Sequence, residues 1–207
     1  TEKRPQHVNI HFYEDLDSDE SFIRLSGNYK NNSSDDPEPL IEPLSSYVNT
    51  QDTKAITPFT EYVVRYWSET SSSGWKGPSI EKQEKLNDSK SLKLHLKSAR
   101  SASRMVLLLP KESNLKSFNL GSLEIQTVLS SWGLYKGYYV VYLNGVYDKE
   151  VELTLNFETS KKEVTGYLID ISTKLPNHLD ELYEARSGIF SPVHTGDQAI
   201  LIKKISI

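Results

Sequence analysis

The stretch Val-Glu-Leu-Thr-Leu-Asn-Phe, residues 151–157, decides the fold class. Its apolar residues alternate with polar ones, and they are Val151, Leu153, Leu155 and Phe157. Successive side chains of a β-strand point to opposite faces of the sheet, so this pattern predicts a strand with one buried face and one wet face. We therefore expect this stretch to cover one side of a hydrophobic core.

Similar strand patterns recur along the whole chain. Apolar and polar residues alternate at 8–12, 22–25 and 92–96, whereas 62–67, 105–109 and 138–143 are apolar on both faces and predict central strands. Residues 199–207 predict a last strand, and Asn144-Gly145 predicts a turn between two strands. About ten strands at short spacing predict a mainly β protein, an antiparallel, jelly-roll-like β-sandwich.

Length and composition limit the possible domain organisation. The chain has 207 residues, and we expect residues 1–207 to form one domain with polar excursions near residues 28–60 and 69–90. No apolar run approaches the roughly twenty residues that a membrane-spanning helix needs. The sequence begins with Thr1 and shows no signal peptide, so we expect a fragment or a processed chain.

Several function classes are disfavoured by composition. The chain has no cysteine, which excludes a disulfide framework, a thiolate zinc site and a cysteine nucleophile. The net charge is −4, and the 24 basic residues are spread along the chain, so we expect no nucleic-acid partner. The glycine and serine patterns of nucleotide-binding loops and of nucleophile elbows are also missing.

Residues 173–198 place His178 and His194 among acidic residues and could suggest a metal site. His178 and Glu181 are one helical turn apart, but no second histidine lies four residues from the first, so the HExxH pattern is absent. A structural role accounts for the stretch better, with a short helix from Asn177 to Arg186 near the C-terminus. We therefore expect no metal, cofactor or catalytic residue in this chain.

The expected helix makes specific predictions about its residues. Asn177 would cap the helix, Arg186 near the far end would suit the helix dipole, and Gly188 would end it. Leu179 and Leu182 would be buried, while His178 would stay in contact with water.

Asp15, Asp17 and Asp19 are spaced like the first ligands of a calcium-binding loop. However, Glu20 stands where that loop needs glycine, and Ser26 stands where it needs a glutamate. We therefore interpret the segment as a solvated hairpin turn, whose charges discourage pairing with another strand. A calcium site of another geometry remains an alternative.

Aromatic residues and glycosylation motifs suggest two further features. Trp67, Trp75 and Trp132 could form a platform on which sugars stack, although aromatic residues of a sheet belong more often to its core.

Asn31, Asn32 and Asn87 each begin a glycosylation sequon within a polar excursion. The sequons favour a lumenal or extracellular chain.

The end of the chain carries a series of short motifs that resemble a known family. They are Leu175-Pro176, Leu179-Asp-Glu-Leu182, Ser191-Pro-Val193 and Gly196-Asp-Gln198 followed by a terminal strand, with His7–Phe12, Asp15–Asp17 and Leu25-Ser-Gly27 near the start. Together they resemble the C-terminal region of the fungal vacuolar membrane proteases, which are multi-spanning relatives of zinc aminopeptidases with an animal counterpart in the endoplasmic reticulum. The relatives commonly carry cysteines in this region, whereas this chain has none.

The resemblance implies a glycosylated domain of a vacuolar membrane protein, facing the lumen. Zinc and the catalytic residues of the parent metalloprotease would lie in a separate peptidase domain, so no catalytic residue is carried over to this chain. We expect a non-catalytic accessory domain that stabilises the peptidase domain or contributes to substrate or partner binding. Its partners would be the peptidase domain and the membrane region of the same polypeptide. The alternative is an independent β-sandwich module that binds a carbohydrate or another ligand.

Overall fold

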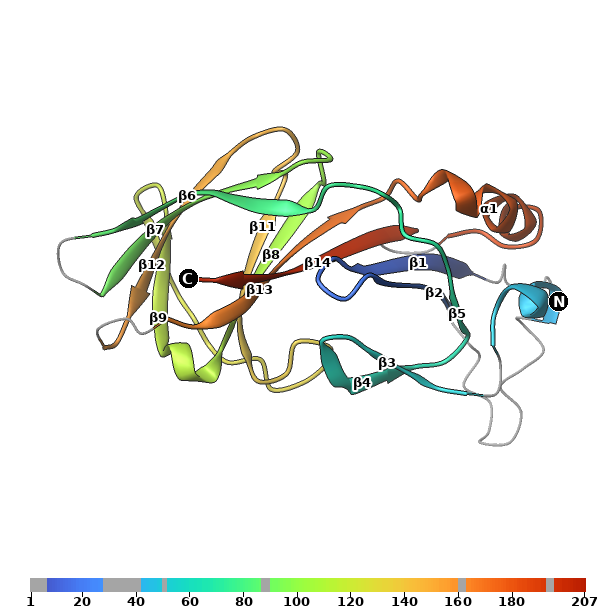
Figure 1. Cartoon of the computed structure of the whole chain (residues 1–207), viewed down its shortest axis with the longest axis horizontal. Helices are drawn as coiled ribbons and strands as arrows, with labels where there is room; N and C mark the ends of the chain where they lie inside the picture. The colour runs from blue at the N-terminus through green and yellow to red at the C-terminus, as the bar shows by residue number, and fades with distance from the viewer. Residues whose placement is uncertain (1–6, 28–41, 50–51, 87–89, 160–162, 193–195) are drawn as a thin grey trace, which may run out of the picture. The chain divides into compact units, whose positions relative to one another are not determined.

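The computed structural model describes residues 7–27, 42–49, 52–86, 90–159, 163–192 and 196–207. Within these residues the protein is mainly β, with fourteen strands and one short α-helix near the C-terminus (Figure 1). The predicted fold class is confirmed, although the expected count of about ten strands was too low. None of the described helices is long and apolar enough to cross a membrane.

The described chain divides into two compact units that interleave in sequence. The first unit comprises residues 1–14, 19–73 and 173–200, and the second comprises residues 15–18, 74–172 and 201–207. The residues of each unit contact one another more than they contact the other unit. Such a division does not show that either unit folds on its own. The expectation of a single domain stays a prediction.

The first unit combines a small sheet with helical segments. Its strands are β1 (Val8–Asp15) without its last residue, β2 (Glu20–Gly27), β3 (Lys54–Ile56), β4 (Phe59–Val64), β5 (Trp67–Glu69) and the start of β14 (Gln198–Ser206). The order in the main sheet is β14–β1–β2–β5, and β3 and β4 form a separate pair. The helical segments are η1 (Glu42–Tyr47), η3 (Asn177–Leu179) and α1 (Asp180–Ser187).

The second unit is a two-sheet structure. One sheet has the order β10–β9–β12–β7–β6, and the other has the order β11–β8–β13–β14. The bounds are β6 (Pro78–Lys85), β7 (Ser91–Ser98), β8 (Arg104–Pro110), η2 (Lys111–Ser113), β9 (Leu115–Leu120), β10 (Leu123–Gln126), β11 (Tyr138–Asn144), β12 (Val151–Phe157) and β13 (Thr165–Ser172). The chain passes between the two sheets repeatedly, as it does in Greek-key sandwiches.

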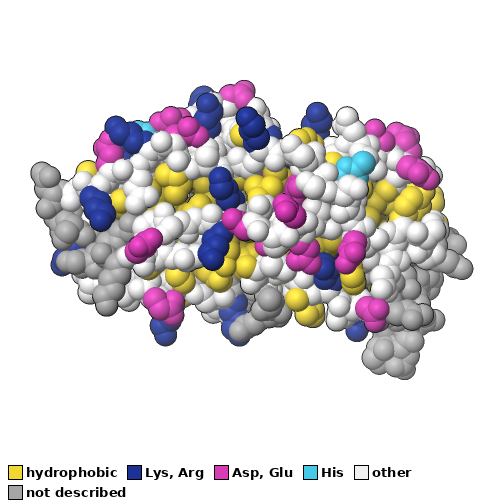
Figure 2. Space-filling model, viewed as in Figure 1, with side chains coloured by type: hydrophobic (Ala, Val, Ile, Leu, Met, Phe, Trp, Pro, Cys, Tyr) yellow, Lys and Arg dark blue, Asp and Glu magenta, His cyan; other side chains and the backbone are white. Residues whose placement is uncertain are grey.

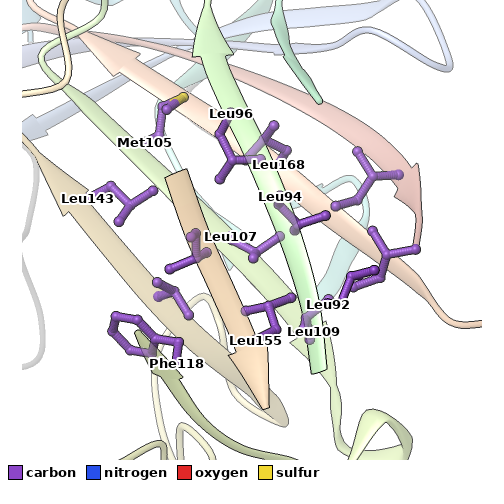
Figure 3. Close-up of a cluster of buried hydrophobic side chains, with 14 of the residues drawn as sticks. Leu92, Leu94, Leu96, Met105, Leu107, Leu109, Phe118, Leu143, Leu155 and Leu168 are labelled. Carbon is purple, nitrogen blue, oxygen red and sulfur yellow. The ribbon is translucent and has the colours of Figure 1, made fainter. Parts of the chain in front are cut away.

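The core of the second unit is built from the alternating residues of these strands. Leu153 and Leu155 of β12 are fully buried, as the opening stretch predicted. They belong to a cluster that also contains Leu92, Leu94 and Leu96 of β7 and Leu107 and Leu109 of β8, and Figure 3 shows these five leucines gathered together. Each fully buried leucine contributes about 2 kcal/mol relative to an exposed one, so this cluster is a main source of the unit's stability.

Other strand predictions are also confirmed. Strands β1, β2, β7 and β14 cover the stretches predicted at 8–12, 22–25, 92–96 and 199–207. Residues 105–109 lie within β8, where all five are buried between two neighbouring strands. The predicted central position of this run is therefore correct.

The prediction of a central strand at residues 62–67 is wrong. Strand β4 ends at Val64, and β5 begins at Trp67. Between them Tyr66 has a φ of 55°, a left-handed conformation that interrupts a strand. Val63 is exposed, so this apolar run is not covered on both faces.

The run at 138–143 forms β11, but it lies at the end of its sheet, and Tyr142 is exposed. The turn predicted at Asn144-Gly145 comes at the end of this strand. Gly145 has the expected positive φ of 72°. However, the strands on either side belong to different sheets, since β11 pairs with β8 while β12 pairs with β7 and β9. The turn therefore connects two layers.

The two polar excursions contain more regular structure than the sequence suggested. The one near residues 28–60 includes η1 and β3, and the one near 69–90 includes β6, which pairs with β7 along most of its length. The excursions are therefore not loops throughout.

Candidate functional site

The helix at the C-terminal end forms largely as expected. Leu179 and Leu182 are buried and His178 is exposed, which confirms those predictions. The predicted cap is wrong, because Asn177 lies inside η3 and Pro176 precedes the segment without a side-chain capping bond. Gly188 follows the last residue of α1, with an ordinary right-handed φ of −69°.

Only His178, one of the two histidines of this stretch, lies among the described residues. His178 Nε2 lies 3.1 Å from Thr70 Oγ1, and its ring packs edge-on against Phe12. His194 lies outside the described residues. Among the residues that are described, no group of three or more histidine or acidic side chains is placed to hold a metal. The expectation that the chain binds no metal stays a prediction.

The acidic segment at residues 15–20 forms the predicted turn between β1 and β2. Asp15 Oδ1 accepts a hydrogen bond from Asp17 N at 3.0 Å, and Asp17 Oδ2 accepts one from Lys204 N. These carboxylates therefore stabilise backbone amide groups, as expected for a structural turn. The three sequon residues Asn31, Asn32 and Asn87 lie outside the described part of the chain.

Two of the three tryptophans are partly buried beside cations. In the first unit, Lys54 Nζ lies 4.9 Å from the ring centroid of Trp67, whose Nε1 donates to the carbonyl oxygen of Asp52. In the second unit, the guanidinium of Arg100 lies 5.1 Å from the ring centroid of Trp75. Both rings therefore take part in internal cation–π contacts.

Trp132 differs from the other two tryptophans because 82% of it is exposed. The structure therefore shows one exposed tryptophan instead of a strip of three. Val128 in the same loop is 81% exposed, and Tyr142 of β11 is 54% exposed. The rings of Tyr135 and Tyr142 lie 6.5 Å apart, which connects the loop to the strand. We call these four residues, Val128, Trp132, Tyr135 and Tyr142, the Trp132 surface.

The loop that carries Trp132, residues 127–137, is held by backbone hydrogen bonds. Ser130 N donates to Tyr138 O at 2.8 Å, and Gly137 N donates to Ser130 O at 2.9 Å. Gly133 and Gly137 have φ values of 73° and 86°, which only glycine adopts easily. Trp132 is therefore exposed on an ordered loop.

A buried ion pair that was not predicted from the sequence joins α1 to β1. Arg186 is 1% exposed and pairs with Asp197, whose other oxygen accepts a hydrogen bond from Ile10 N at 2.8 Å. Arg186 Nε and Nη1 are buried without a hydrogen-bond partner among the described residues. Arg186 was expected only to complement the helix dipole, and no sequence signal links it to Asp197.

A second buried network joins the two sheets of the second unit. Asp170 of β13 is completely buried; it accepts hydrogen bonds from Arg100 Nε at 2.7 Å and from Ser98 Oγ at 2.8 Å. Burial raises the pKa of Asp170, and the neighbouring Arg100 opposes this rise. The donors occupy both carboxylate oxygens, so we assign a structural role to this network.

Acidic and basic side chains are interspersed on the face that Figure 2 shows. Apolar patches lie between them. This distribution provides no concentrated basic area on that face, and the expectation that nucleic acid is not a partner stays a prediction.

Comparisons with known proteins do not assign the chain to a family. No family model matches it, and no curated protein does. Among solved structures it is similar to the Fcho1 Mu homology domain of Danio rerio with a bound Eps15 peptide, at 8% sequence identity. The match covers 96% of this chain and 92% of that one with a TM-score of 0.24, which is too low to support any inference about this chain.

Proposed function

We propose that the chain is a non-catalytic, lumenal accessory domain of a vacuolar membrane metalloprotease and that it binds its partner through the Trp132 surface. The partner is another part of the same polypeptide, namely the peptidase domain or the membrane region. The C-terminal motifs that resemble the vacuolar protease family support this assignment. Zinc would be held by the peptidase domain of the parent protein.

The exposure of Trp132 on an ordered loop carries the proposal. Leaving a tryptophan side chain in water forfeits the favourable free energy of burying a large apolar surface. A loop that is already ordered loses little conformational entropy when it binds a partner. Exposed aromatic residues of this kind are typical of the residues that dominate binding at protein interfaces.

The coding sequence upstream of Thr1 provides the first test. We expect it to encode several membrane spans and a zinc peptidase domain. An upstream sequence without them would refute the assignment to this family.

Association with the rest of the polypeptide provides the second test. Trp132→Ala should weaken binding of the chain to the remainder of the parent protein by at least about tenfold, since a central aromatic residue typically contributes 2 kcal/mol or more. Tyr147→Ala is the matched control, because Tyr147 is 56% exposed and lies beyond the other end of β11. Equal effects of the two substitutions, measured by biolayer interferometry, would exclude the Trp132 surface as the binding site.

The same surface favours a second candidate function, the independent carbohydrate-binding module. Trp132 and Tyr142 expose aromatic faces on which a sugar ring can stack. Titration with soluble oligosaccharides, followed by tryptophan fluorescence, tests this function. A saturable change that disappears in Trp132→Ala would support the module over the accessory domain.

A further inference from the structure

Strand β11 leaves part of its backbone unpaired along one side. It is the terminal strand of its sheet and pairs with β8 on the other side. Gly145 N donates to Ser103 O across the β8 side, whereas Tyr138 O accepts from Ser130 N on the open side. Hydrogen-bonding directions alternate along a strand, so the backbone groups of Tyr142 also point to the open side.

The chain itself occupies the first part of this open side. Leu129 forms an antiparallel bridge with Tyr139, beside the bond from Ser130 N to Tyr138 O. No further backbone partner lies along this side from Tyr142 to Asn144 among the described residues. The edge thus already accepts one short extended segment, and its backbone continues beyond that segment to Asn144.

The composition of β11 does not protect this edge against pairing. Its sequence, Tyr-Tyr-Val-Val-Tyr-Leu-Asn, contains no charged residue and no proline. By contrast, the terminal strand β6 of the other sheet contains Glu81, Lys82, Glu84 and Lys85, and its register is interrupted near Ile80. Charges and irregularities of that kind discourage pairing at sheet edges.

We propose that the open edge of β11, from Tyr142 to Asn144, binds an extended peptide segment as an additional strand. Tyr142 and Trp132 would contact the side chains of this segment. The open edge favours a polypeptide over a lipid or a sugar, because it offers backbone N–H and C=O groups in the spacing that another strand matches. This proposal rests on the proposed function, because it states that the partner binds the Trp132 surface as an extended strand.

A peptide selection on the whole chain tests this inference. Ten-residue peptides from a random phage-displayed library are selected for binding, synthesised with a fluorescent label and titrated by fluorescence anisotropy. Each peptide amide is then methylated in turn, which removes one hydrogen-bond donor. An added strand uses every second amide, so methylation at alternate residues should weaken binding about tenfold, while methylation between them should have little effect.

Substitutions in the protein provide an independent measurement. Tyr142→Pro removes an outward N–H without removing a bond to β8 and should also weaken binding about tenfold. Gln126→Pro is the matched control on the edge of β10, where Thr127 N bonds inward to Lys116 O and the N–H of Gln126 therefore points outward. It should leave binding unchanged.

Three results would overturn the inference. They are the selection of no peptide, methylation effects that do not alternate along the peptide, and equal binding by the wild type and Tyr142→Pro. The methylation series does not depend on whether a variant folds. If Trp132→Ala still weakens association with the parent polypeptide by at least about tenfold, the proposed function stands and only strand addition fails.

Discussion

At the scale of single residues, His11 links stability to pH. Its Nε2 lies 3.4 Å from Ser26 Oγ, and its Nδ1 has no hydrogen-bond partner among the described residues. Burial, together with the smaller effect of the nearby charge of Arg24, lowers the pKa of His11 from 6.5 to about 4. The folded protein therefore keeps this ring neutral in mild acid.

The free energy of unfolding should decrease as the pH falls from about 6.5 to about 4. In this range the unfolded chain protonates His11 and the folded protein does not, so protons favour the unfolded state. The loss should reach roughly 2 kcal/mol at pH 4.5. His11→Gln should remove this part of the pH dependence, as measured by urea unfolding at pH 7 and pH 4.5. Equal losses in the variant and the wild type would assign the effect to other groups.

The buried ion pairs show what a sequence cannot reveal about single residues. Arg186 and Asp197 are 11 positions apart in the sequence, and each also fits a common surface role. Asp170 lies in an apolar strand and depends on Arg100, 70 residues earlier. Only the tertiary fold brings such partners together. In contrast, the burial of Leu179 and Leu182 follows from helical spacing alone, and it was predicted correctly.

At the scale of elements, α1 depends on its apolar face. Leu182 is 3% exposed, whereas Glu184 on the same helix is exposed. Leu182→Ala should lower the free energy of unfolding by about 2–5 kcal/mol, because it leaves a cavity. Glu184→Ala should change it by less than about 0.5 kcal/mol, since alanine keeps the helix propensity high. Denaturant unfolding of both variants measures the difference, and similar losses would mean that α1 does not pack as described.

The alternating stretches formed strands as predicted, whereas only one of the three apolar runs, residues 105–109, lies in a central strand. Residues 151–157 specify their buried face because each polar residue marks the opposite face. Residues 62–67 and 138–143 contain apolar residues at successive positions. This pattern is typical of a central strand, but it is equally typical of an exposed strand at an interaction site. Alternation therefore predicts packing, while hydrophobicity alone does not.

At the scale of the whole molecule, the chain passes repeatedly between two compact units. We expect one cooperative unfolding transition, because β14 contributes residues to both units. Leu25→Ala in the first unit and Leu153→Ala in the second should each lower the melting temperature of the whole transition by roughly 5–15 °C. Differential scanning calorimetry measures this. Two transitions, of which each variant shifts only one, would show that the single-domain prediction is wrong.

Strand β14 also sets the order of events while the chain is being made. It lies between β13 and β1, and it follows every other described strand in the chain. Until the ribosome has added residues 198–206, β1 and β13 each lack a neighbour and expose a strand edge that can pair with other chains. Neither unit can finish folding before that moment. The nascent chain should therefore depend on chaperones until its last strand emerges.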